Sequence, residues 1–366
     1  MRRSIKCVCA RLSLLLLVTA LATTAQNQNG SSSSPSGDKQ QTNEPRQAGK
    51  PLRTHVNEVI VPVTVTDKKG ELVLDLSQTD FHVFDNGVEQ KIDRFDLAGD
   101  PLAVALVIET SSQIQAVAPT IRGMGTIFTE TVMALSGEAT VITYDSAVEV
   151  RQPFTQDHDA IEKAIAGVEF QSPEKKLYDG MAKAVELLKT QPPPYRRIML
   201  VVGESQDYGS QARLRQIVRD AQLADITIYA VGPSSTGADL RYGRDEKPGE
   251  RQPLPLRLPK PLPPVSTDSD YLAVAIWLLS RGTNEIRNHQ LEVAVASTGG
   301  IHYRALHDET IRTAIDRIGG ELHAQYVLSY VPSTDPPPGF NEIKVTLSRP
   351  NVKLRARPGY YVSSVR

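Results

Sequence analysis

Four near-continuous apolar runs, separated by stretches with helical spacing, constrain the fold more than any other feature of this sequence. The runs are residues 103–108, 139–144, 198–202 and 226–231. Strands of a parallel sheet are buried on both faces by crossover helices, so they appear as continuous apolar runs rather than alternating ones. Apolar residues recur at helical spacing in residues 114–135, 160–168, 177–188, 214–223 and 310–322. This order predicts a doubly wound, mostly parallel α/β sheet covered on both faces, with residues 147–154 as an antiparallel edge strand.

Short β segments are predicted on both sides of this α/β region. Residues 55–67 alternate in valine, and Asp85-Asn86-Gly87 suits a tight hairpin turn between residues 81–84 and 90–95. Further short strands are predicted at 325–331, 342–347, 353–357 and 360–362. Small β pieces are not stable alone. We therefore predict that the N-terminal β segment (53–98) and the C-terminal β segment (325–366) form one small β-sandwich, with the α/β domain (99–324) inserted between them.

The N-terminal residues are typical of an export signal. Residues 1–25 combine a basic start, an apolar stretch and small residues suited to cleavage, and an uncleaved anchor is the alternative. Residues 26–52 are rich in Ser, Gln, Asn and Gly, which predicts a disordered linker. No later segment reaches the ~20 apolar residues that a membrane span needs. We expect an exported protein, located in the periplasm, on the outer surface or in the medium.

Composition excludes several classes of function. With 41 basic and 42 acidic residues the net charge is −1, which disfavours nucleic-acid binding. Both cysteines lie within the first ten residues, so the body of the chain holds neither disulfides nor cysteine-zinc sites. No phosphate-binding glycine motif follows the first strand, and the seven histidines lack metal-ligand spacing.

A long insertion interrupts the α/β pattern. Residues 233–270 are rich in proline and charge, and an irregular loop of this length is usually functional or disordered. Its Leu-Pro repeat at 253–264 is a solvated spacer or a polyproline ligand. The apolar run 272–279 is read as buried core, with an exposed partner-binding face as the alternative.

Polar residues gather where the predicted strands end. Glu109-Thr110-Ser111-Ser112-Gln113 follows the first run and residues 203–210 follow the third, while residues 172–179 lead into a predicted helix. In an open α/β sheet, ligands bind outside the carboxyl ends of the strands. The sequence therefore places the candidate site at this edge.

These segments, in this order, resemble the von Willebrand factor A domain. Over residues 55–366 the chain also resembles the VWFA-related domain proteins abundant in Acidobacteria. That narrower resemblance rests on Asp80-Phe81, Asp85-Asn86-Gly87, Leu177-Tyr178-Asp179, Ser297-Thr298-Gly299-Gly300, Gln325 to Tyr330 and Arg357 to Tyr361. The resemblance implies a Rossmann-like fold and protein-protein or adhesive binding. It also implies a metal-ion-dependent adhesion site, in which a carboxylate of the ligand completes the coordination of Mg²⁺.

The metal motif departs from the family pattern. Where the family has Asp-x-Ser-x-Ser, a Thr and a later Asp, this chain has the residues Glu109, Ser111, Gln113, Lys175 and Glu204. Carboxylate and amide oxygens still suit Mg²⁺, whereas an ammonium has no lone pair and repels a cation. Two interpretations stay open. Either Glu109, Ser111, Gln113 and Glu204 form a modified Mg²⁺ site, or Lys175 replaces the metal through an internal ion pair. Ser112, Lys175 and Ser205 are expected to line the ligand-binding face.

The sequence thus predicts a binding module rather than an enzyme. Its partner is expected to be a protein, one able to present a carboxylate. A metal-free scaffold protein of the cell envelope is the first alternative. A serine hydrolase is the remote alternative, because Gly203-Glu204-Ser205 resembles a nucleophile elbow, although Asp207 replaces the glycine that such a turn needs.

Overall fold

The structure is a computed structural model of the chain and describes residues 58–97, 99–232, 290–305 and 308–363. The predicted signal (1–25), the linker (26–52), the insertion (233–270) and the apolar run 272–279 lie outside the described residues.

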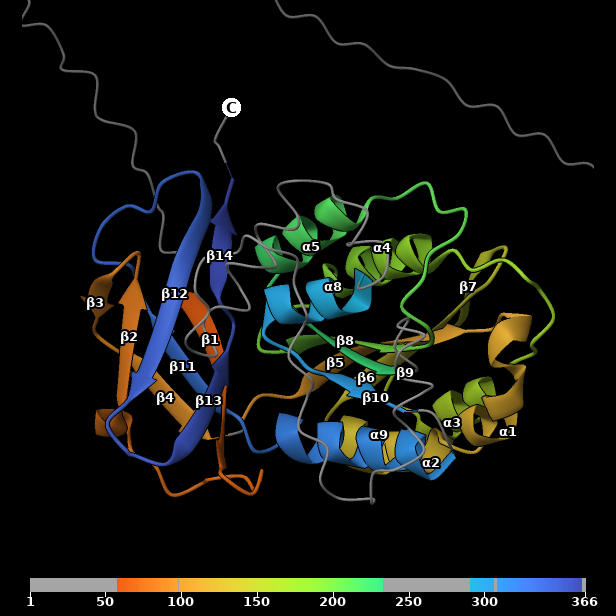
Figure 1. Cartoon of the computed structure of the whole chain (residues 1–366), viewed down its shortest axis with the longest axis horizontal. Coiled ribbons are helices and arrows are strands. Elements are labelled where there is room, and N and C mark those ends of the chain that lie inside the picture. The colour runs from red at the N-terminus through yellow and green to blue at the C-terminus, as the bar shows by residue number, and fades with distance from the viewer. Residues whose placement is uncertain (1–57, 98, 233–289, 306–307, 364–366) are drawn as a thin grey trace, which may run out of the picture. The chain divides into compact units, whose positions relative to one another are not determined.

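A six-stranded sheet forms the centre of the α/β domain, in the order β10-β9-β8-β5-β6-β7 (Figure 1). The strands are β5 (Leu102–Glu109), β6 (Glu138–Tyr144), β7 (Val148–Thr155), β8 (Arg196–Val202), β9 (Ile226–Gly232) and β10 (His302–Arg304). All neighbours are parallel except β6 and β7, which are antiparallel. Every residue of β5 is buried, as a central parallel strand requires. The predicted doubly wound sheet and its antiparallel edge are confirmed.

Helices cover both faces of this sheet (Figure 1). On one face lie α4 (Leu177–Leu188), α5 (Leu214–Leu223) and α8 (Gln290–Thr298), which pack on one apolar cluster with the sheet. On the other face lie α1 (Ala118–Arg122), α2 (Gly125–Ile127), α3 (His158–Ala166) and α9 (Asp308–Leu322). The bounds of α4 and α5 are those predicted from apolar spacing. The strand β10 was not predicted, because three partly exposed residues carry no periodic signal.

Residues 114–135 differ from the single helix that their spacing predicted. They form a 3₁₀ turn, η2 (Ser112–Val117), then α1, α2 and the π-helical segment η3 (Phe128–Met133). Pro119 lacks an amide hydrogen, and Gly123 and Gly125 weaken helix formation. A Cβ at Gly125 would lie 3.1 Å from the Cα of Glu162, so close packing against α3 also favours a glycine there.

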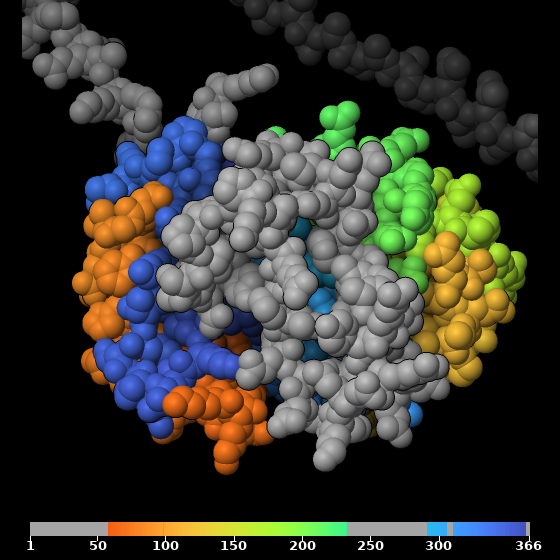
Figure 2. Space-filling model, in the orientation of Figure 1, coloured from red at the N-terminus to blue at the C-terminus, as the bar shows by residue number. Residues whose placement is uncertain are grey.

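The terminal β segments form two four-stranded sheets around a shared apolar core. One sheet has the order β13-β1-β11-β4, with β13 (Val352–Ala356), β1 (Val59–Asp67), β11 (Tyr326–Tyr330) and β4 (Arg94–Leu97). The other has the order β14-β12-β2-β3, with β14 (Gly359–Val362), β12 (Gly339–Leu347), β2 (Phe81–Asp85, after the 3₁₀ turn Gln78–Asp80) and β3 (Val88–Gln90). Figure 2 shows orange N-terminal and blue C-terminal residues interleaved over one surface. The predicted pairing of the two ends is confirmed.

One predicted strand of the sandwich is wrong. Residues 90–95 were expected to form a single strand, but β3 ends at Gln90 and β4 begins at Arg94 in the opposite sheet. Between them the chain crosses the core, and Ile92 is buried there. The turn itself matches the prediction, with Asn86 and Gly87 at φ 48° and 82°.

The sandwich and the α/β domain are joined by two arginines, of which Arg357 is buried and Arg355 is partly exposed. Arg357 hydrogen-bonds Asp225 and the carbonyl of Gln222, and Arg355 forms an ion pair with Glu321 of α9.

Among the described residues, no helix combines the length and the apolar character needed to cross a membrane.

Candidate functional site

Three loops meet at the carboxyl edge of the central sheet. The loop after β5 pairs with the loop before α4, because the N–H of Ser112 donates to the carbonyl of Ser172 at 2.7 Å. The loop before α4 pairs with the loop after β8, because the N–H of Tyr208 donates to the carbonyl of Lys175 at 2.9 Å. These backbone bridges hold the candidate residues 109–113, 175 and 204 at one place.

Lys175 is the centre of this site. Its ammonium hydrogen-bonds Oε2 of Glu204 and lies 3.9 Å from Oε1 of Glu109. The side chains of Lys175 and Glu109 are 0% exposed, whereas that of Glu204 is 28% exposed. The ammonium also lies 5.8 Å from the centre of the Tyr208 ring. One cation is thus enclosed by two carboxylates and an aromatic ring.

Glu109 is held by hydrogen bonds as well as by charge. The hydroxyl of Ser111 donates to its Oε1, and the backbone N–H of Glu204 donates to its Oε2 at 2.6 Å. Burial raises the pKa of Glu109 above its ordinary value of 4.5, and the Ser111 hydrogen bond and the Lys175 charge oppose this rise. The carboxylate is therefore costly to bury and depends on Lys175 for compensation.

Gly203 allows β8 to approach Glu109 this closely. A Cβ at position 203 would lie 2.4 Å from the hydroxyl oxygen of Tyr144 and 2.7 Å from Oε2 of Glu109. Tyr144 is fully buried, and burial raises the pKa of its phenol well above the ordinary range. Sequence analysis did not single out Gly203 or Tyr144 for these roles. The only signal was a glycine directly after an apolar run.

Two further carboxylates fix the loop after β8 to the start of α4. Asp207 accepts hydrogen bonds from the N–H of Tyr178 at 3.0 Å and the hydroxyl of Ser210 at 2.6 Å. Asp179 accepts from the N–H groups of Gln211 at 3.0 Å and Ala212 at 2.8 Å. Asp179 belongs to the segment that carried the family resemblance, so the sequence signal was present although its role was not predicted.

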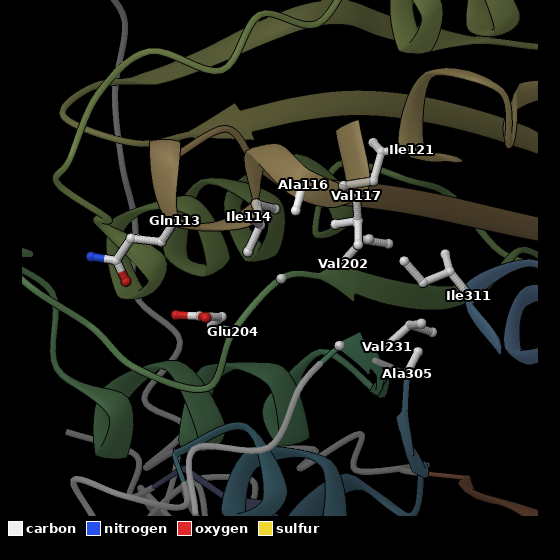
Figure 3. Close-up of a pocket in the computed structure, with 12 residues that line it drawn as sticks. Gln113, Ile114, Ala116, Val117, Ile121, Val202, Glu204, Val231, Ala305 and Ile311 are labelled. Atoms are coloured by element: carbon white, nitrogen blue, oxygen red, sulfur yellow. The ribbon is translucent and has the colours of Figure 1, made fainter. Parts of the chain in front are cut away.

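The other predicted site residues differ in their exposure to solvent. Ser112 and Gln113 are exposed at the edge, and Figure 3 shows Gln113 with Glu204 at one end of a pocket. Lys175 and Ser205 were expected to line the ligand-binding face, but both are 0% exposed, because the converging loops cover them. The Ser205 hydroxyl has no hydrogen-bond partner among the described residues. Its burial denies it the access that a nucleophilic serine needs, and no described residue hydrogen-bonds it as a base.

The arrangement does not fit the divalent metal that the resemblance implies. The position adjoining both carboxylates is filled by the ammonium of Lys175, which has no lone pair and carries like charge. Within the described ranges, no group of three or more His, Cys, Asp or Glu residues is suited to a metal ion.

A search of curated proteins finds no match. Among solved structures, an aerotolerance-related membrane protein of Bacteroides fragilis is similar at 10% identity and TM-score 0.39, covering 60% of this chain and 98% of that one. Proximal thread matrix protein 1 of the mussel byssus, with a zinc-occupied MIDAS motif, is similar at 10% identity and TM-score 0.42, covering 64% and 48%. The von Willebrand factor type A domain family matches residues 104–244. The chain therefore contains a von Willebrand factor type A domain.

Proposed function

We propose that this protein is an exported interaction module that binds a protein partner at the carboxyl edge of its sheet without a metal ion. The observation that carries the proposal is the buried ion pair of Lys175 with Glu204, with Glu109 beside it. Domains of this family are generally interaction modules. Here the ammonium supplies the positive charge that a metal would otherwise place between the two carboxylates.

Electrostatics favours the lysine over a bound cation. A buried carboxylate without a counter-charge costs several kcal/mol, and a tethered ammonium compensates it with no entropy cost for capturing an ion from solution. Adding Mg²⁺ would require Lys175 to leave a position where its side chain is fully enclosed. The carboxylate-bearing partner that the resemblance implied gains no support from this geometry, because Glu204 covers the ammonium.

The test is thermal melting of residues 51–366 with Mg²⁺ or Mn²⁺ and with chelator. A ligand that binds only the folded state raises the melting temperature by mass action. We expect no shift for the natural sequence and a rise with metal for Lys175→Thr, which restores the family residue. Lys176→Thr, a change at the neighbouring lysine, is the matched control and is expected to show no rise. A chelator-sensitive rise in the natural sequence would overturn the proposal.

Export is proposed from residues 1–25 alone. Residues 1–52 fused to a reporter that is active only outside the cytoplasm are expected to confer activity. Replacing the apolar residues Leu14 to Leu17 by Ser and Asn is expected to abolish it. Equal activity of the two fusions would contradict export by this segment.

A further inference from the structure

A small apolar pocket opens beside Glu204. It has a volume of about 180 Å³ and lies where β8 and β9 end, beneath η2 and the start of α9. Its walls include Ile114, Ile121, Val202, Val231 and Ile311, all of which are buried in the core of the α/β domain. The pocket is therefore built on fixed core residues rather than on loose surface side chains.

The size of the pocket fits one side chain. An apolar cavity of about 150 Å³ holds a benzene-sized group, whereas pockets for drug-sized ligands and cofactors measure about 300–1,000 Å³. Gln113 and Glu204 are its polar lining side chains, and they lie at one end of it (Figure 3). An occupant would thus bury an apolar group and meet a carboxylate at the rim.

The rim carboxylate is available for a second interaction. Oε2 of Glu204 is held by Lys175, and no described residue hydrogen-bonds its Oε1. The side chain is 28% exposed, and the neighbouring Tyr208 is 54% exposed. A guanidinium or ammonium group can pair with a carboxylate. The second oxygen of Glu204, at the rim of the pocket, therefore suits a cation.

The charge of the described loops at this edge points the same way. The loops 109–113, 145–147, 172–179 and 203–210 carry six carboxylates and two lysines. Of the two lysines, Lys175 is enclosed and already paired. An approaching carboxylate would meet repulsion, whereas an approaching cation is steered to the edge.

We propose that the pocket and Glu204 together bind a protein segment that presents an apolar side chain next to an arginine or lysine. This inference rests on the proposed function, since it names the chemistry of the partner at the same edge. It reverses the polarity of the recognition that the family resemblance implied.

The experiment is selection of a phage-displayed library of random peptides on the full chain. We expect enrichment of sequences with an aliphatic or aromatic residue beside Arg or Lys. Ala116→Phe fills the pocket mouth from an exposed position of η2, and is expected to weaken the selected peptides about tenfold or more. Gln115→Phe, exposed on the same turn but not lining the pocket, is the matched control and is expected to leave binding unchanged.

Charge is tested separately from shape. Glu204→Gln keeps the outline of the side chain, and replacing the basic residue of the peptide by Glu reverses its charge. We expect about tenfold weaker binding from either change, and weaker binding at high salt. Circular dichroism checks that Glu204→Gln is folded. If this variant does not fold, the substitution in the peptide tests the role of charge and Ala116→Phe tests the role of the pocket.

Three outcomes of the peptide experiments would overturn the inference. They are enrichment of acidic peptides, binding that Ala116→Phe does not affect, and no enrichment at all. A homodimer that Ala116→Phe dissociates would assign the pocket to a second copy of the chain, which also overturns it. The outcome of thermal melting with Mg²⁺ or Mn²⁺ does not depend on these results. The two experiments therefore distinguish a wrong inference about the partner's chemistry from a wrong proposal that the site works without a metal.

Discussion

At the scale of single residues, Lys175 decides the chemistry of the edge. Its ammonium is the counter-charge within 4 Å for Glu109, and both side chains are fully buried. A charge in such a position cannot be screened by water, so the pair is interdependent: each group is stable only while the other is present.

Lys175→Met is expected to lower the free energy of unfolding by about 3 kcal/mol, because it leaves a buried carboxylate uncompensated. Urea denaturation measures this loss. In a double-mutant cycle with Glu204→Gln, the second change is expected to cost less when Lys175 is already replaced, with a coupling of about 1–3 kcal/mol. Purely additive losses would show that the two side chains do not interact in solution.

Glu138, at the start of β6, is expected to make the stability of the fold depend on pH. Its Oε1 is buried without a partner among the described residues, and burial raises the pKa of this carboxyl above the ordinary 4.5. The folded state therefore holds the proton to higher pH than the unfolded state. The contribution of Glu138 to stability is fully present below the pKa that its carboxyl has in the unfolded chain. It is lost as the pH rises through the higher pKa that the carboxyl has in the folded protein.

Glu138→Gln removes this titration. We expect the natural protein to lose stability relative to the variant as the pH rises from about 4 to 7. Urea midpoints across this range measure the difference. Parallel pH curves for the two proteins would argue against the buried environment of Glu138.

At the scale of elements, the binding edge depends on how the loop after β8 is fastened to α4. Asp179 accepts two backbone hydrogen bonds from this loop, and Asp207 accepts one from α4 in return. Loops are positioned for function by a rigid scaffold, and here the two carboxylates form the attachment.

Asp179→Ala is expected to destabilise the chain by about 1.5–3 kcal/mol, because two backbone N–H groups lose a charged acceptor. The loop at 203–212 is also expected to become the first site of limited proteolysis, which mass spectrometry of the fragments identifies. Glu174→Ala, an exposed change in the same region, is the control and should leave both properties unchanged. Equal resistance of Asp179→Ala and the control would remove Asp179 from this role.

At the scale of the whole molecule, the two ends of the chain complete one sandwich that is joined to the α/β domain through buried arginine contacts. Arg357 is 6% exposed and bonds the carbonyls of Ile60 and Gly359 in the sandwich, and Asp225 and the carbonyl of Gln222 in the α/β domain. These contacts favour cooperative unfolding of the two parts.

Arg357→Leu is expected to cost at least about 2 kcal/mol, since it leaves buried carbonyls unpaired. It is also expected to split a single calorimetric transition into two. Arg349→Leu removes an exposed pair with Asp75 and should cost less than about 1 kcal/mol without splitting the transition. A single transition in both variants would show that other contacts suffice to couple the parts.

The amino-acid sequence by itself determined the elements that leave a local pattern of side chains. The apolar runs of β5, β6, β8 and β9, the bounds of α4 and α5, and the turn at Asn86-Gly87 were all readable, because each leaves a local pattern of side chains. It also placed the polar residues of the site at one edge, since parallel strands end together.

Tertiary structure alone decided what those residues do there. The crossing at Ile92 follows from packing against distant segments, which no local period records. At Gly125, close packing against α3 adds to the local effect of Pro119 and the glycines. The burial of Lys175 and Ser205 likewise depends on three loops that meet only in the folded chain. A lysine in a loop is ordinarily solvated; enclosure between two carboxylates makes it part of the core, and only the fold supplies that enclosure.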